Sequence, residues 1–134
     1  MSFLDWRSDW DTGMGEMDRQ HQRLVHLIND LHDAMKVGQG AGRVGTVLHW
    51  LQDYTETHFQ QEEALLRARK WPGLNRHLVL HHELLDQLGR YVSDHDAGRH
   101  VSSLDISDFL RDWLINHIVQ EDKQYGAALS GTAV

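Results

Sequence analysis

Residues 51–65 read LQDYTETHFQQEEAL, and this stretch decides the fold. Its Leu51 and Leu65 belong to a stripe that advances in steps of three and four residues through Thr55, His58 and Glu62. Such steps return to one face of an α-helix, so the stretch predicts a helix buried along one side. The histidine and the glutamate stand out, because burying either group is unfavourable unless it is hydrogen-bonded, paired or bound to a metal.

The same periodicity extends in both directions along the chain. Breaks at Gly38–Gly42, at Trp71-Pro72-Gly73 and in the polar stretch from Asp94 to His100 separate four segments. We expect helices over about 17–37, 43–69, 74–94 and 103–128, after an irregular arm of residues 1–16. Four amphipathic helices joined by short loops predict an all-α, antiparallel up-down-up-down four-helix bundle. The arm's tryptophans are expected to dock on this bundle.

The remaining stripes are apolar at the same spacing. Their members are Met17, Leu24, Ile28, Leu31 and Met35 in the first helix, Val44 and Leu48 in the second, Leu74, Leu84, Leu88 and Tyr91 in the third, and Ile106, Leu110, Leu114 and Tyr125 in the fourth.

Composition narrows the class of protein. The 134 residues are 40% hydrophobic and 25% charged, as expected for one globular domain over 1–134. Disulfides and thiolate metal sites are excluded, because the chain has no cysteine. The net charge of −7 and the lack of a basic cluster argue against nucleic acid as a partner. No apolar run is long enough for membrane insertion, and the acidic N-terminus MSFLDWRSDWD is unlike a secretory signal, so we expect a cytoplasmic protein.

Histidines occupy the buried stripe of every predicted helix. The buried stripe of the first helix includes His21, that of the second His58, that of the third His77 and His81, and that of the fourth His117. Residues four apart, such as His77 and His81, lie about 40° apart around a helix and can reach the same ion or adjacent ions. A lone histidine in such a stripe is more often a hydrogen-bonded core residue. Five in register on four helices favour a shared metal site.

Some polar residues are ambiguous. On the fourth helix, Glu121 stands four residues after His117, so periodicity favours it as the acidic ligand. Asp122 stands five residues after His117, which places it about 140° from His117 around an ideal helix. A local π-type widening would change that choice. Glu63 and His82 lie about 100° from the buried stripe, which predicts a solvated or outer position.

The other histidines are expected outside the site. Periodicity places His26 and His49 at the surface, and His95 and His100 in a loop. His32 shares a face with His21 but lies roughly 16 Å along the axis, too far to join the same site.

Four strings resemble the bacteriohemerythrin family in order and separation. They are MDRQH ending at His21, HFQQEE from His58, WPGLNRHLVLH from Trp71 to His81, and WLINHIVQED from Trp113 to Asp122. The resemblance implies a non-haem di-iron centre in which His77, His81 and His117 bind one iron and His21 and His58 bind the other. It also implies that Glu62, Asp122 and a solvent-derived oxygen bridge the two irons. It thereby favours Asp122 over Glu121.

The implied ligand set predicts reversible dioxygen binding for storage, transport or delivery. With both carboxylates and the solvent-derived oxygen as bridges, one iron has roughly six donors and the other roughly five, which leaves one open position beside His21 and His58. Di-iron oxidases in similar bundles use mostly carboxylates, so we expect no enzymatic activity. An oxygen-consuming enzyme is the expected recipient, and the chain is expected to be a monomer.

An apolar pocket is expected around the open position, because water or protons there would promote oxidation of the irons. Leu24 and Leu114 project toward the site on helical grounds, one turn from His21 and His117. The resemblance adds Phe59, Trp113 and Ile118. All five also have core packing as a simpler role.

Three alternatives remain open. A di-iron oxidase or peroxidase could use the same pair of ions. An oxygen or redox sensor generally needs an output domain, whereas this chain ends in a short polar tail after the fourth helix, so we expect a stand-alone domain. A structural zinc site prefers four ligands, fewer than the seven candidates.

Overall fold

The computed structural model describes residues 4–36, 40–99 and 101–130. Within these ranges, the side chains of residues 36, 40–42, 103–104, 114–115, 119 and 130 are outside the description. All regular elements of the described part are helical. In chain order they are the 3-10 helix η1 (Ser8–Trp10), α1 (Gly15–Lys36), α2 (Gly40–Ala68), α3 (Leu74–Asp96), α4 (Ser103–Leu114), the π-helix η2 (Ile115–Asp122) and α5 (Lys123–Ser130).

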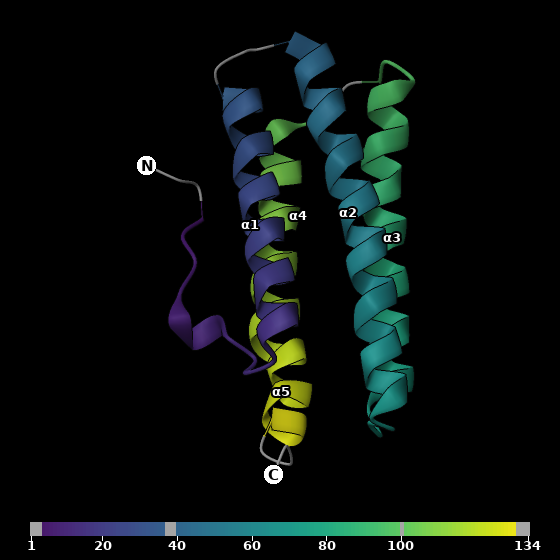
Figure 1. The fold of residues 1–134 in the computed structure, drawn as a ribbon. Helices are drawn as coiled ribbons and strands as arrows, with labels where there is room; N and C mark the ends of the chain where they lie inside the picture. The colour runs from purple at the N-terminus through teal and green to yellow at the C-terminus, as the bar shows by residue number, and fades with distance from the viewer. Residues whose placement is uncertain (1–3, 37–39, 100, 131–134) are drawn as a thin grey trace.

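Four long rods run alternately up and down (Figure 1). The first three are α1, α2 and α3, and the fourth is formed by α4, η2 and α5 in direct succession. Helix α1 packs against α2 and α4, and α2 packs against α3. The expected all-α up-down-up-down bundle is confirmed.

Four helix ends differ from the expected ones by two or three residues. Helix α1 begins at Gly15, before the expected start, and α5 ends at Ser130, after the expected end. Helix α2 begins at Gly40, inside the glycine-rich break. Helix α3 continues to Asp96, so His95 lies in a helix rather than in the expected loop, while His100 lies outside the described residues. Beyond Asp96 the amide of Gly98 (φ 75°) donates to the backbone carbonyl of His95. The amide of Arg99 donates to the backbone carbonyl of Asp94. This Schellman arrangement ends the helix with a glycine in the left-handed region.

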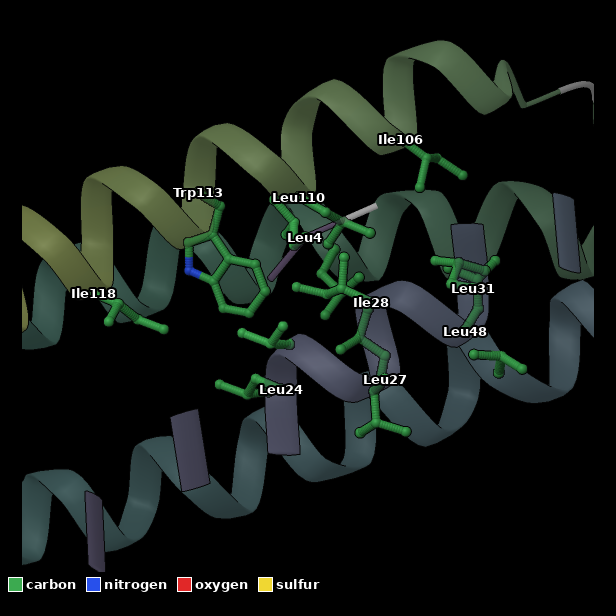
Figure 2. Packing of buried hydrophobic residues seen from close by; sticks show 14 of the residues in the cluster. Leu4, Leu24, Leu27, Ile28, Leu31, Leu48, Ile106, Leu110, Trp113 and Ile118 are labelled. Carbon is green, nitrogen blue, oxygen red and sulfur yellow. The ribbon is translucent and has the colours of Figure 1, made fainter. Parts of the chain in front are cut away.

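A large apolar core fills one half of the bundle (Figure 2). Leu31, Leu48 and Leu51 are completely buried there, and Ile28 and Leu110 are 1% exposed. Burying a leucine or isoleucine side chain stabilises the fold by about 1.5–3 kcal/mol, so this half supplies much of the driving force for folding.

A smaller apolar cluster lies toward the other end of the bundle. It contains Met17, Leu66, Tyr125 and Leu129. At this end of α2 the completely buried leucine is Leu66 rather than Leu65, which is only half-buried against the cluster. The polar residues of the buried stripes lie along the rods between the two clusters.

The N-terminal arm packs on the bundle as expected. Trp10 is buried at 8% exposure, and Trp6 contacts it edge-to-face with ring centroids 5.5 Å apart. The backbone of Leu4 exchanges two hydrogen bonds with the side chain of Asn29 on α1, at 2.8 and 2.7 Å. Thr12 donates its amide and its hydroxyl to Asp18. These bonds fix the arm beside α1, as Figure 1 shows.

Within the described ranges, no helix combines the length and the apolar character that a membrane crossing requires.

Candidate metal centre

Seven buried side chains meet in the middle of the bundle. Their ligand atoms form two groups in which all atoms lie within 4.8 Å of one another. One group contains Glu62, His77, His81, His117 and Asp122, and the other contains His21, His58, Glu62 and Asp122. None of the seven is more than 4% exposed. The structure therefore brings together all seven residues expected from the sequence, in two groups that share both carboxylates.

Helical spacing accounts for six of the seven positions. His58 and Glu62 on α2, and His77 and His81 on α3, are each separated by one turn and face the same side. The rings of His77 and His81 lie 4.5 Å apart, centroid to centroid. His21 on α1 contacts His58 edge-to-face at 4.8 Å, so the helices converge at the same level.

The seventh position depends on a local change of helix type. Residues Ile115–Asp122 form a π-helix, in which each turn contains more residues than in an α-helix. The five-residue step from His117 to Asp122 then faces inward, and Asp122 is fully buried. Glu121 instead points to the surface, where Arg76 donates to it at 3.1 Å. The ideal-helix expectation for Glu121 fails because the fourth rod widens here.

Each carboxylate presents one oxygen to each group of histidines. Glu62 Oε1 lies 2.6 Å from His77 Nε2 and 3.0 Å from His81 Nε2, whereas Glu62 Oε2 lies 3.3 Å from both His21 Nε2 and His58 Nε2. This arrangement suits a carboxylate that bridges two cations.

The two carboxylate oxygens of Asp122 also contact different histidines. Its Oδ1 lies 3.0 Å from the Nε2 atoms of His77 and His117, and its Oδ2 lies 2.9 Å from His21 Nε2. Two carboxylates split between the same two sets of imidazoles define two adjacent positions for ions.

The donor set fits metal ions better than hydrogen bonds alone. Among the described side chains, His58 Nε2 and both oxygens of Asp122 are buried and have no partner in hydrogen-bond geometry. The Nε2 atoms of His81 and His117 face each other at 3.1 Å, and a hydrogen bond there requires one ring to donate and the other to accept. Buried polar groups are normally satisfied, so these atoms indicate cations between them.

The charges of the cluster are strongly coupled in the absence of metal. Burial raises the pKa of Glu62 and Asp122, but the surrounding imidazoles outweigh burial and hold both pKa values well below their usual range. Burial lowers the pKa of His21, His77 and His117, but the two carboxylates raise the pKa to about 9, 9 and 10, respectively. Burial dominates at His58 and lowers its pKa. Metal ions must therefore displace protons from this cluster.

Three further residues orient the cluster. The Glu63 carboxylate lies 2.8 Å from His81 Nδ1, and Gln20 Oε1 lies 2.6 Å from His58 Nδ1. The Tyr125 hydroxyl donates to Glu62 Oε2 at 3.0 Å. Burial, followed by the nearby Glu62, raises the pKa of Tyr125, so its hydroxyl stays protonated. A partner on the outer ring nitrogen fixes the orientation of a ligating histidine.

The sequence indicated only part of this outer set. Glu63 has the solvated or outer position expected from its angle on the helix. Gln20 and Tyr125 were missed as partners of the site: Tyr125 was identified only as part of an apolar stripe. The only feature of the sequence that could have indicated Gln20 as a partner is its position directly before His21.

Four of the five expected pocket residues have described side chains, and all four are buried. Leu24, Phe59, Trp113 and Ile118 are each at most 5% exposed. The Phe59 ring stacks on His81 at 3.6 Å between centroids and meets Trp113 edge-to-face at 6.2 Å. In Figure 2, Trp113 points inward toward Leu24. The fifth residue, Leu114, ends α4, and its side chain lies outside the described residues.

The remaining histidines lie away from the cluster. His26, His49 and His82 are exposed, as expected. His32 is half-buried, with its Nδ1 3.4 Å from Ser107 Oγ.

Comparisons with known proteins agree with this geometry. A family model described as the hemerythrin HHE cation binding domain matches residues 12–129. A bacteriohemerythrin of Pseudomonas aeruginosa is 34% identical over 125 residues, covering 93% of this chain and 80% of that protein. A bacteriohemerythrin of Methylococcus capsulatus is 31% identical over 131 residues, covering 97% and 99%. A crystal structure of wild-type hemerythrin is similar with a TM-score of 0.90 at 31% identity, covering 96% of this chain and 99% of that one.

Proposed function

The chain belongs to the hemerythrin family, and we propose that its seven clustered side chains hold two iron ions and bind dioxygen reversibly. Proteins of this family generally bind oxygen at a non-haem di-iron site and are mainly non-enzymatic. When bound, the two irons supply the electrons that dioxygen takes up and returns. In the proposed assignment, His77, His81 and His117 hold one ion, His21 and His58 hold the other, and Glu62 and Asp122 are shared.

The unequal size of the two donor groups carries the proposal. One group has five residues and the other has four, because only two histidines stand on the side of His21. Octahedral iron takes six donors. One additional shared oxygen would therefore complete the first position and leave the second one donor short. A single vacancy suits a small diatomic ligand and leaves no place for a second substrate.

The chain's own residues keep both positions rigid. Glu63 and Gln20 fix the ring orientations of His81 and His58 through the outer nitrogens. Tyr125 remains a hydrogen-bond donor to Glu62 and limits the rotation of that carboxylate. The outer partners thus favour one geometry over the exchange of ligands that an oxidase uses.

The apolar side chains exclude water from the vacancy. Leu24 and Ile118 are 1% and 2% exposed, Phe59 stacks on His81, and Trp113 packs edge-to-face against Phe59. Together with Leu114, they form the proposed dioxygen pocket. A dry pocket delays the entry of protons and water, which would otherwise leave the irons oxidised.

The proposed role is oxygen storage or delivery by a cytoplasmic monomer, with an oxygen-consuming enzyme as recipient. Few large apolar side chains are exposed in the described part of the surface: Trp50 at 49% and Val79 at 57%. Surfaces without a large apolar patch are typical of monomers. The absence of cysteine suits a reducing compartment.

An optical cycle tests the proposal. The iron-loaded protein is reduced without air, exposed to oxygen and then flushed with inert gas, and its absorption is recorded at each stage. We expect the reduced spectrum to return on flushing. Irreversible oxidation, or oxygen consumption that continues with a reductant, would instead identify an enzyme.

A further inference from the structure

A threonine interrupts the buried stripe of α2 without belonging to the metal cluster. Thr55 stands between Leu51 and His58 in that stripe and is 1% exposed. Its hydroxyl oxygen is buried and has no hydrogen-bond partner among the described residues. Burying a hydroxyl without a partner destabilises a fold, and valine has the same shape without this cost. The hydroxyl at this position therefore indicates a partner that the chain itself does not supply.

A second threonine on the same helix satisfies its hydroxyl locally. Thr57 is exposed, and its hydroxyl donates to the backbone carbonyl of Asp53, four residues earlier, at 3.1 Å. Helical threonines commonly bond to their own helix in this way. The corresponding carbonyl for Thr55 is that of Leu51, and no such bond forms. The Thr55 hydroxyl can therefore bond to a group inside the bundle.

Helix geometry places Thr55 beside the proposed open position. Helices α1 and α2 run in opposite directions (Figure 1), and the rings of His21 and His58 lie 4.8 Å apart, centroid to centroid. Leu24 follows His21 by three residues on α1. Thr55 precedes His58 by three residues on α2. Both therefore lie about 4.5 Å from the two histidines along the bundle, on the side of the apolar half. Thr55 has the position on α2 that the pocket residue Leu24 has on α1.

The pocket contains one other buried donor without a partner among the described side chains, the indole nitrogen of Trp113. The Trp113 ring contacts Phe59, which stacks on His81, a ligand of the other ion in the proposed assignment. Thr55 is instead one turn from His58, which holds the ion with the open position. Of the two donors, the hydroxyl is the one assigned to that position.

We propose that the Thr55 hydroxyl donates a hydrogen bond to the small ligand bound at the open position and thereby raises the affinity for it. This inference rests on the proposed function, because iron holds the ligand. A ligand that takes electron density from iron becomes negatively charged, and charged acceptors form the stronger hydrogen bonds. Leu24, Phe59 and Ile118 carry no donor. A hydroxyl supplies one without placing an ionisable group, and hence a source of protons, in the pocket.

Azide binding to the oxidised, iron-loaded protein tests the proposal, because azide is a small anion that binds ferric iron and accepts hydrogen bonds. Thr55→Val keeps the shape of the side chain and removes the hydroxyl. We expect unchanged iron content and an azide dissociation constant raised about threefold to tenfold, the effect of losing one hydrogen bond. The vibrational frequency of bound azide should also shift. Thr57→Val is the matched control and should leave all three quantities unchanged.

The metal-free protein provides an independent measurement. Thr55→Val should raise its melting temperature, because the substitution removes a buried hydroxyl that lacks a partner. A melting temperature that stays the same or falls would overturn the proposal, since the hydroxyl would then be satisfied within the protein.

Failure of this inference can be distinguished from failure of the proposed function. Azide binding does not require reversible oxygenation, so it can be measured even if the optical cycle shows irreversible oxidation. Equal azide affinity in the unaltered protein and in Thr55→Val would overturn the role of Thr55 and leave the proposed function intact. An equal loss of affinity in Thr57→Val would also overturn that role, because the effect would then come from α2 in general.

Discussion

The two halves of the bundle use the same helices in opposite ways. In the half that contains Leu31, Leu48 and Leu51, the inward stripes are apolar and completely buried. In the half that contains Glu62 and Asp122, the same stripes carry charged and polar groups at equal burial. The apolar half is stabilised by burial itself, whereas the polar half requires cations or protons to offset the cost of desolvation.

This difference separates folding from function. The apolar half and the arm can hold the four rods in place when no metal is bound. The polar half can then keep its ligands in position before an ion arrives. Loss of a shared ligand should therefore disrupt the polar half and leave the apolar half intact.

The largest effect is expected at Asp122. Asp122→Asn removes a charge and one shared ligand, so the iron content should fall from two to below one per chain. Bound ions stabilise the fold by about 4 kcal/mol each when free iron is about 1,000 times the dissociation constant, and this contribution should disappear. Iron analysis and thermal unfolding measure both quantities. Glu121→Gln is the control: equal iron loss there would show that the π-helix does not select the ligand.

The next largest effect is expected from truncating one buried leucine in each half of the bundle. Leu48→Ala and Leu24→Ala should each cost about 2–5 kcal/mol, because each leaves a cavity. Leu24, at 1% exposure, is one turn from His21, whereas Leu48 lies in the apolar half (Figure 2). Only Leu24→Ala should also speed autoxidation, by severalfold, because it opens the proposed pocket. Chemical denaturation and the decay of the oxygenated spectrum test this pair. Equal autoxidation rates would contradict the proposed pocket.

A smaller effect is expected from pH in the metal-free protein. His21 and His77 have pKa values raised to about 9, and that of His117 is raised to about 10, above the usual value of about 6.5. Their stabilising contribution is therefore complete below about pH 6.5 and is lost as the pH rises through 9 to 10. The melting temperature should fall over this range. A melting temperature that stays constant or rises would contradict the charge arrangement of the cluster.

The smallest effect concerns the arm. In Gly126→Ala, the new Cβ would overlap the Thr12 carbonyl oxygen and lie 2.9 Å from Thr12 Cα, so backbone must move. We expect a loss of about 1–3 kcal/mol in stability. Gly89→Ala is the control, since its nearest contact would be Gln52 Nε2 at 3.6 Å. It should stabilise α3 by about 0.5–1 kcal/mol, because glycine is unfavourable within a helix. If Gly126→Ala stabilised the protein as Gly89→Ala is expected to do, the packing of Thr12 on α5 would be refuted.

The bundle and most of the polar cluster follow from spacing in the sequence. His58 with Glu62, and His77 with His81, needed only the geometry of an ideal α-helix. Asp122 did not follow from that geometry, because a π-helix depends on how the fourth rod packs rather than on its own sequence pattern. The resemblance favoured Asp122 for a reason that periodicity could not supply.

Other features were beyond periodicity for the same reason. The burial of Leu66 in place of Leu65 depends on how α2 rotates at its end. The hydrogen bond from Tyr125 to Glu62 joins residues 63 positions apart. His95 was expected in a loop because polar residues surround it, whereas the glycine that ends α3 is Gly98. Tertiary contacts decided the first two cases, and local hydrogen bonds from Gly98 and Arg99 decided the third.

Anomalous diffraction from crystals of the iron-loaded protein tests the central claim most directly. The account predicts two iron peaks, one coordinated by His77, His81 and His117 and the other by His21 and His58, with Glu62 and Asp122 shared between them and one fewer ligand at the second iron. A single peak, or equal coordination of both irons by the chain, would contradict it.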